Sequence, residues 1–276
     1  MLNFNHLLNE VGLSLNDVKL LRHQDTRYSG SASPYVMWRD DRDRFEAYQQ
    51  TQSFGNRSTL DVTYWAAFVG MPNKGTIFAG LYRVLDRFPL SNDRRHPADG
   101  SVELAGSCDF YTLEHCEQML PMEGRLLIEW GVGYRSWIQR ADRQAKPIIE
   151  LRQEFKEPEF PGFSQFIVKL SDIETMPAGW SAVLGSTRGI YLLTCPRTKE
   201  QYVGSASGVG GFIGRWRDYA TTGHGGNVAL RSRDASDYQI SILETVGSNA
   251  TETNILVLES LWKQKLQSRE MGLNRN

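Results

Sequence analysis

The sequence has little cysteine, no long apolar run and almost no net charge, and each shortage narrows the class of protein. Its 276 residues include 3 cysteines, which are too few for a disulfide framework. Nowhere do about 18 apolar residues follow one another, so no membrane-spanning helix is expected. The first residues also lack a basic stretch followed by an apolar run. We therefore expect a cytoplasmic protein without a membrane partner.

Two of the cysteines lie close to a histidine, which raises the question of a zinc site. Cys108, His115 and Cys116 are ligand types that zinc prefers. A fourth ligand and a paired CxxC spacing are both missing. The sequence therefore favours ordinary buried thiols at these positions.

The net charge of −1 does not by itself indicate a nucleic-acid partner, but its distribution is uneven. Residues 181–276 carry 11 Lys and Arg against 8 Asp and Glu, a local charge of +3, and the remainder of the chain is acidic. This small asymmetry permits a phosphate-binding surface in the C-terminal part of the chain.

The composition, with 40% hydrophobic residues, predicts a folded protein, and the length suits two domains. Within residues 1–155, Ser14 to Asp17 reads as a helix start, with the helix continuing to about His23. Residues 64–70 and 76–84 flank a polar turn and predict a hairpin. Further strands are expected at 125–130 and 147–151. This pattern predicts a strand-rich, barrel-like domain with helices.

A structured connector is expected over residues 156–184, because residues 166–170 can form a strand between segments rich in Pro and Gly. Residues 185–276 show strands at 189–194, 201–204 and 238–243, a helix containing 212–219, and a helix from about 252 to 269. We therefore expect an α+β protein whose C-terminal part is a compact α/β unit. Its sheet should be small, mainly antiparallel and flanked by helices.

Five polar residues of the C-terminal part occur in a characteristic order. Gly189-Ile190-Tyr191 and Tyr202-Val203-Gly204 place two tyrosines eleven positions apart on a predicted hairpin. Arg215 follows on the next helix, Glu259 lies on the last long helix, and Asn274 lies beyond it. This constellation resembles the signature of the GIY-YIG nuclease superfamily. The resemblance covers about a third of the chain.

The resemblance implies a metal-dependent endonuclease. Tyr191 would be the general base and Tyr202 would bind the attacking water or the phosphate, although the two roles can be exchanged. Arg215 would contact the phosphate. Glu259 would be the ligand of Mg²⁺ or Mn²⁺. Its place at the border of an apolar helical stripe, taken alone, fits a solvated edge residue better than a carboxylate that binds a cation, and its position within the constellation reverses that preference.

Other residues of the C-terminal domain are candidates for supporting roles. Tyr219 lies one helical turn after Arg215 and can present its hydroxyl beside the guanidinium, and His224 is a further catalytic candidate between two glycines. The remaining candidates are expected to touch the substrate: Gly204, Arg217, Asn227, Lys263 and Asn274. Asn274 could alternatively anchor the C-terminal segment.

The N-terminal domain is expected to choose the substrate, because a nuclease centre contains little sequence information. Trp65 and Arg135 are candidates for stacking on, or contacting, an extruded base, although core packing is the simpler explanation for any single aromatic residue here. The strand-rich character faintly resembles barrel modules that read modified bases in bacterial defence proteins.

These expectations combine into a restriction or phage-defence endonuclease acting on double-stranded DNA, either unmodified or base-modified. Two strands require two cuts, which a homodimer on DNA would supply. One alternative is a repair or mobile-element endonuclease that responds to DNA structure. The other is a DNA-binding protein that keeps the nuclease fold without activity.

Overall fold

The computed structural model describes residues 2–25, 27–28, 30–72, 75–131, 136–222 and 237–274, and it is a mixed α+β protein. Its contacts divide the chain into two compact units, Met1–Pro158 and Glu159–Asn276. Across the described ranges, no helix has both the length and the apolar character needed to cross a membrane.

The first unit is built on a curled sheet. Its strands are β1 (Val18–His23), β2 (Thr51–Gln52), β3 (Tyr64–Gly70), β4 (Thr76–Pro89), β5 (Arg94–Arg95), β6 (Val102–Glu103), β7 (Asp109–His115), β8 (Leu126–Ile128), β9 (Ile138–Arg140) and β10 (Ile148–Leu151). Its helices are α1 (Phe4–Glu10), α2 (Pro34–Asp40) and α3 (Arg42–Gln50). Short 3₁₀ helices are η1 (Leu15–Asp17), η2 (Gly30–Ala32), η3 (Phe54–Asn56) and η4 (Glu117–Met122).

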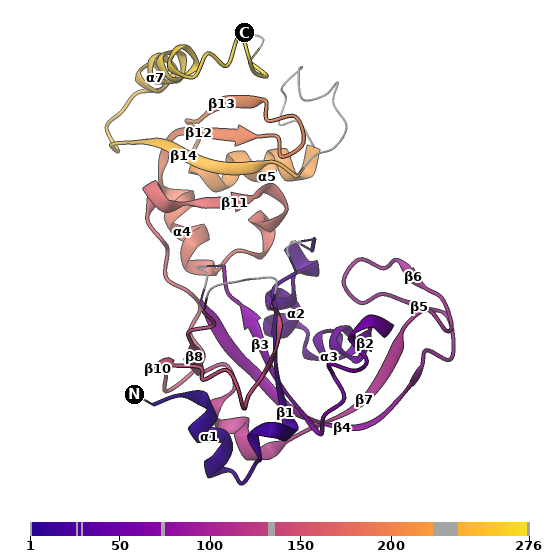
Figure 1. Cartoon of the computed structure of the whole chain (residues 1–276). Helices are drawn as coiled ribbons and strands as arrows, with labels where there is room; N and C mark the ends of the chain where they lie inside the picture. The colour runs from indigo at the N-terminus through magenta and orange to yellow at the C-terminus, as the bar shows by residue number, and fades with distance from the viewer. Residues whose placement is uncertain are drawn as a thin grey trace. The chain divides into compact units, whose positions relative to one another are not determined.

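The sheet of this unit runs in the order β10-β8-β4-β3-β1-β9, and β7 pairs with β4 and β2. β1 and β3 are parallel, whereas the other pairs are antiparallel. The long strands β4 and β7 continue as a ribbon toward the small β5–β6 hairpin (Figure 1). The described strands thus form a half-barrel whose end strands are β10 and β9.

Both faces of this sheet are buried, as β3 shows. Ala66 and Phe68 pack on the side of Phe4 from α1, whereas Ala67 and Val69 pack with Phe45 from α3. A strand covered on both faces needs consecutive apolar residues, which explains the unbroken apolar run at 65–69. The predicted hairpin of β3 and β4 is confirmed by their register, from Tyr64 opposite Arg83 to Gly70 opposite Thr76.

The helix predicted from Ser14 to about His23 is wrong. Only the 3₁₀ turn η1 forms there, and β1 follows as an interior strand between β3 and β9. Leu20 and Leu21 are both fully buried although adjacent, because they face opposite sides of the sheet. Such a pair of apolar neighbours fits a helix start equally well when only local signals are read.

The second unit is a four-stranded sheet between helices. Its strands are β11 (Ile167–Lys169), β12 (Arg188–Thr194), β13 (Gln201–Ala206) and β14 (Gln239–Val246). Its helices are α4 (Ala178–Ser186), α5 (Gly211–Thr222) and α7 (Glu252–Lys265), with 3₁₀ helices η5 (Phe163–Gln165) and η6 (Leu170–Thr175). The strand order is β11-β14-β12-β13, all antiparallel, which Figure 1 shows directly.

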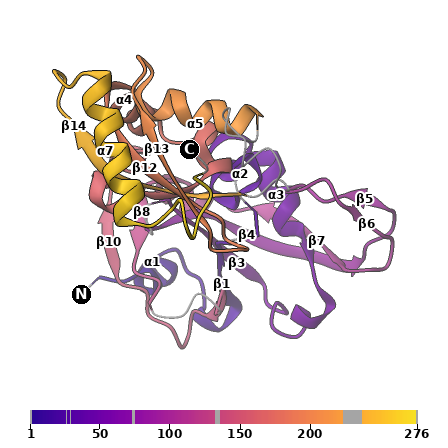
Figure 2. The same cartoon turned by 90° about the horizontal axis from the view of Figure 1, so that it is seen from above.

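The segment expected as a connector contributes structure to this unit, because β11 pairs with β14 and Trp180 of α4 is buried in the same core as Trp216 of α5. This core lies on one face of the sheet, under α5. The other face is covered by α7, whose Ile255 packs on Ile190 and Val203. Figure 2 shows α7 lying over β12 and β13.

Candidate active site

The two tyrosines of the hairpin point to the same face of the sheet. Tyr191 on β12 and Tyr202 on β13 are 0% and 7% exposed, and both belong to the core under α5. Tyr191 lies opposite Gly204, where an added Cβ would stand only 2.5 Å from the tyrosine Cζ and Oη. Glycine at 204 therefore allows the phenol of Tyr191 to lie across β13.

Helix α5 brings two more polar groups to this phenol. The Tyr191 hydroxyl donates to the Tyr219 hydroxyl at 3.1 Å. Arg215 Nη2 lies 3.5 Å from the same Tyr219 oxygen, and the guanidinium carbon lies 5.0 Å from the Tyr219 ring centre. Phe212 and Trp216 anchor α5 in the core and so fix the face that carries Arg215 and Tyr219. Tyr191, Arg215 and Tyr219 thus form one tyrosine–arginine cluster.

Burial controls the protonation of this cluster. Desolvation raises the pKa of Tyr191, the neighbouring Tyr202 adds to the shift, and Arg215 opposes it. Desolvation and Tyr191 likewise raise the pKa of Tyr219. Both phenols are therefore neutral at pH 7, and Arg215 alone does not stabilise a phenolate.

Glu259 of α7 lies on the other side of the sheet. It is 9% exposed, and one carboxylate oxygen accepts a hydrogen bond from the Ser205 hydroxyl. The second oxygen lies 2.7 Å from the ammonium of Lys263, one helical turn further along, whose side chain is 6% exposed. Lys263, expected as a substrate contact, is therefore the buried ion-pair partner of Glu259.

Strand β13 lies between the tyrosine–arginine cluster and Glu259. Gly204 faces the tyrosine–arginine cluster, whereas its neighbour Ser205 faces α7 and holds Glu259. Within the part of the chain that the structure describes, the hydrogen bonds and ion pairs of Glu259 run to Ser205 and Lys263. Because β13 is the last strand of the described sheet, groups from both faces can meet a ligand that lies along its edge.

The side chain of Asn274 anchors the C-terminal segment to β13. Its side-chain oxygen accepts from the Val203 N–H at 2.9 Å and from the Ser268 hydroxyl at 2.7 Å, and its amide nitrogen donates to the Val203 carbonyl at 2.8 Å. The backbone N–H of Leu273 donates to the Gln201 carbonyl at 2.8 Å. The C-terminal segment therefore occupies the start of the β13 edge up to Val203.

The remaining candidates are dispersed. Arg217 is half-exposed and faces Glu174 at 3.4 Å, outside the tyrosine–arginine cluster. Trp65 is fully buried against Tyr111 in the core of the first unit. His224, Asn227 and Arg135 lie outside the described residues.

Ser205 was not among the residues expected at the site. Its position directly after Tyr202-Val203-Gly204 was a usable signal, because alternation along a strand places it on the face opposite the tyrosines. Cys108 and Cys116 are buried, as expected.

The donor set around Glu259 fits a hard cation only in part. Among the described residues, no group of three or more His, Cys, Asp or Glu side chains could hold a metal ion. Magnesium, however, commonly binds through one or two carboxylates, with water and substrate phosphate completing the shell. Glu259 can supply that carboxylate, and the Ser205 hydroxyl adds a neighbouring oxygen. Lys263 competes with a cation for the same carboxylate.

Comparison with known proteins gives limited information. No protein-family model matches the sequence, and no curated protein matches it. Among solved structures, a mutant of the catalytic domain of intron endonuclease I-TevI is 27% identical over 33% of this chain and 94% of that domain. The TM-score is 0.27, which is too low to establish a shared fold. An assignment of function to this chain therefore depends on its own residues.

Proposed function

We propose that the chain is a metal-dependent DNA endonuclease of the GIY-YIG type, acting on double-stranded DNA. The observation that carries this proposal is the tyrosine–arginine cluster at Gly204, together with the carboxylate that the next residue of the same edge strand, Ser205, holds on the opposite face of the sheet. Phosphodiester hydrolysis needs a proton acceptor, a cation for the phosphate and stabilisation of the leaving oxygen. The two groups offer these functions together.

Each residue has a role in this mechanism. Arg215 binds a non-bridging phosphate oxygen, since its guanidinium is the one cation of the cluster. Tyr191 acts as the base in its phenolate form: its hydroxyl proton first leaves to bulk water, Arg215 favours the anion that remains, and this anion then takes the proton of the attacking water. The Tyr219 hydroxyl, 3.1 Å away, can donate a hydrogen bond to that phenolate, and Tyr202 packs beside Tyr219 with ring centres 6.2 Å apart.

Glu259 would hold Mg²⁺ or Mn²⁺, which when bound neutralises phosphate charge and stabilises the leaving oxygen. Without a cation, Lys263 balances the buried carboxylate. We infer that Lys263 turns toward the phosphate when DNA and metal arrive, because a buried ammonium needs a new anion once its partner is taken.

The test is cleavage of phage DNA by Glu259→Gln in Mg²⁺ and in Mn²⁺. The substitution keeps volume and removes the anionic ligand, so we expect cleavage to fall by about 10³-fold or more while DNA binding persists. Glu252→Gln, an exposed acid in the first turn of the same helix, is the matched control and should cut normally. Wild-type turnover in Glu259→Gln would eliminate this carboxylate as the ligand.

A second candidate function follows from the Glu259–Lys263 pair, because a lysine that remains on the carboxylate would keep metal out and leave a DNA-binding protein without activity. Titration of the wild-type chain with Mg²⁺ and Mn²⁺ on supercoiled DNA separates the two. Binding without nicking at any metal concentration selects the inactive alternative.

We further propose that residues 1–155 choose the substrate, either a sequence or a modified base, and that the biological role is restriction or phage defence. A panel of unmodified, methylated and hydroxymethylated phage DNA tests this. Cleavage of one modified substrate alone would select modification-dependent restriction. Cleavage that follows branched or damaged DNA instead would select a repair or mobile-element role.

A further inference from the structure

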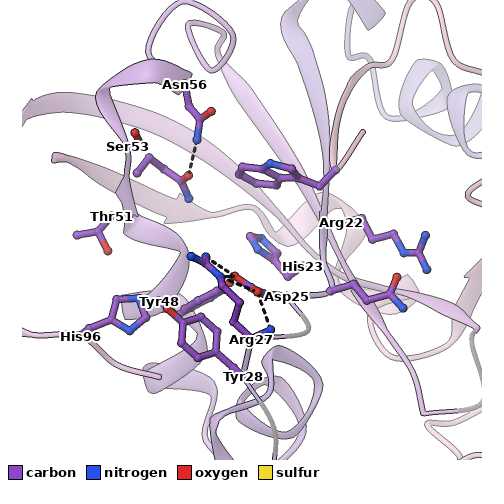
Figure 3. A pocket seen from close by; sticks show the side chains of 13 residues that line it. Arg22, His23, Asp25, Arg27, Tyr28, Tyr48, Thr51, Ser53, Asn56 and His96 are labelled. Carbon is purple, nitrogen blue, oxygen red and sulfur yellow. Dashed lines mark hydrogen bonds and ion pairs between the residues drawn. The ribbon is translucent and has the colours of Figure 1, made fainter. Parts of the chain in front are cut away.

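The first unit contains a pocket of about 480 Å³ that no step above uses. This volume lies within the range of small-molecule sites, about 300 to 1,000 Å³. The pocket forms where β1 ends, and its walls come from α3, β2, η3 and the segment before β9. Figure 3 shows His23 at its centre with Thr51 and His96 at one end, whereas the side chain of Arg22 points away from His23.

Aromatic rings make up much of the wall. Tyr28 and His96 stack at 5.3 Å with 27° between their planes, and Tyr48 stands nearly perpendicular to both. Trp137 lines the pocket near His23, with ring centres 6.1 Å apart. The backbone N–H of Arg22 donates to the Trp137 carbonyl at 2.8 Å, which fixes this tryptophan beside the end of β1. Such walls suit a flat ring.

His23 supplies an unused polar atom. Its side chain is 4% exposed, and its Nε2 has no hydrogen-bond partner in the described structure. Burial lowers the pKa of His23 to about 4, with Gln49 opposing the shift, so the imidazole is neutral at pH 7. Leaving a buried polar atom unpaired costs about 1 to 3 kcal/mol. Nε2 has almost no accessible surface, so a ligand reaches it only after a neighbouring side chain moves.

Amide groups line the same pocket. Asn56 donates to the Gln52 carboxamide oxygen at 3.4 Å, and Gln52 donates to the Gln49 carbonyl at 3.0 Å, as Figure 3 shows for the first pair. These contacts orient two carboxamides, which can both donate and accept. A ring edge that carries donors and acceptors side by side matches this lining.

The charges of the pocket indicate how many phosphates it would accept. Arg27 is neutralised by Asp25, which it contacts through Nε at 3.0 Å. Arg22 has no ion pair with a carboxylate among the described residues, but its guanidinium lies on the face of β1 opposite His23, 5.9 Å from the ring centre of Trp130. On the His23 side the charges of Arg27 and Asp25 balance, which suits a base whose phosphate stays in the DNA backbone better than a free nucleotide, whose terminal phosphate carries about −1.5 to −2.

We propose that this pocket takes a nucleobase everted from duplex DNA, with its ring among Tyr48, His96 and Trp137 and its polar edge at Gln52 and Asn56. Enzymes that read an everted base use stacking on aromatic side chains and hydrogen bonds to the base edge. The inference deepens the proposed function, because it names how the N-terminal unit would select the substrate.

The test uses the full chain carrying Glu259→Gln and measures DNA affinity by fluorescence anisotropy. The probes are duplexes that differ at one cytosine, either unmodified, 5-methylated or 5-hydroxymethylated, placed opposite guanine or opposite an abasic site. Eversion costs less when the base is unpaired. We therefore expect at least one cytosine to be bound about tenfold more tightly opposite the abasic site.

Four substitutions locate the effect in the pocket. Trp137→Leu and Asn56→Leu should each remove the abasic-site preference, since base stacking on an aromatic ring is worth roughly tenfold in affinity. Trp137→Phe should keep it. Phe54→Leu, an exposed aromatic in η3 outside the pocket lining, is the matched control and should also keep it. Circular dichroism checks that each variant folds. If Trp137→Leu does not fold, Asn56→Leu alone tests the pocket.

The inference is overturned if every duplex pair binds equally, or if the preference survives in both folded pocket variants. Free deoxycytidine monophosphates are added as competitors, and displacement of DNA at concentrations comparable to the duplex would assign the pocket to a free nucleotide instead. If the wild type cuts DNA but no abasic-site preference is found, the pocket proposal fails and the nuclease proposal stands. If the abasic-site preference is found but the wild type does not cut DNA, the nuclease proposal fails and the pocket proposal stands.

Discussion

The candidate active site and the pocket of the first unit treat their buried polar groups in opposite ways. In the second unit, Tyr191 donates to Tyr219, and Glu259 is held by Ser205 and Lys263. In the wall of the pocket, His23 Nε2 has no partner among the described residues. A set of mutually bonded groups fixes geometry before a substrate arrives, whereas unpaired groups favour a ligand that completes them.

The largest effects are expected from the tyrosine–arginine cluster, because its contacts are proposed to act on the reacting atoms. Tyr191→Phe and Arg215→Ala should each slow single-turnover cleavage by about 10² to 10⁴-fold. Arg215→Ala should also weaken DNA binding, since it removes a phosphate contact. Tyr191→Phe should not.

The pH dependence separates the two variants further. Because burial holds the pKa of Tyr191 above its usual value, the phenolate fraction and hence the rate should rise with pH from 7 to 9. That rise should persist in Arg215→Lys and vanish in Tyr191→Phe. If it vanishes in Tyr202→Phe instead, the base is Tyr202.

Gly204→Ala sharpens the comparison by disturbing a preformed contact without removing a polar group. The added methyl would stand 2.5 Å from the Tyr191 hydroxyl oxygen, so the phenol must move. We expect about 10²-fold slower cleavage, in line with the misplacement of a catalytic group. Gly208→Ala, where an added Cβ meets nothing within 4 Å, is the control. Equal rates in both variants would show that the position of Tyr191 does not matter.

Lys263→Met tests whether the lysine holds the place of a cation. Removing one partner of a buried ion pair leaves the Glu259 carboxylate uncompensated, so the free energy of unfolding should fall by about 3 kcal/mol without metal. Mg²⁺ should restore part of this lost stability in Lys263→Met. In the wild type it should raise the free energy of unfolding only slightly. Lys265→Met, on the exposed side of the same helix, is the control in denaturant titrations. A loss that Mg²⁺ does not reduce would argue against a cation at Glu259.

The smallest effect expected concerns the acid stability of the pocket. His23 has a folded-state pKa of about 4 against an ordinary value near 6.5, so the unfolded chain binds its proton first as pH falls. This stability is present above pH 6.5 and is lost between pH 6.5 and 4, by up to about 3 kcal/mol. His23→Leu should flatten this part of the stability curve. An unchanged curve would mean that His23 is accessible to protons in the fold.

The parts of the fold that depend on local pattern were predictable. The β3–β4 hairpin follows from two apolar runs around a turn, and the β12–β13 hairpin from the spacing of its strands. Helical spacing likewise placed Tyr219 beside Arg215, one turn away, whereas the approach of Tyr191 to this helix was implied only by the family resemblance.

Long-range pairing was not predictable in the same way. The contact of Glu259 with Ser205 depends on how α7 packs across β13, 54 positions away in the chain. β1 was mistaken for a helix because its burial comes from β3 and β9, and not from its own sequence. The residues that line the pocket come from segments between residues 22 and 137, so no single stretch of sequence predicts it.

The segment Gly272 to Asn274 has a consequence for handling the protein. A sheet edge with unpaired backbone groups is a template for pairing with another chain and so for aggregation. Leu273 and Asn274 occupy the backbone of Gln201 and Val203 on the edge strand, and a side chain at 272 would collide with the Gln201 carbonyl. Ending the chain before Gly272 would thus expose an unpaired strand edge that favours aggregation. Affinity tags and truncations are better placed away from the C-terminal segment.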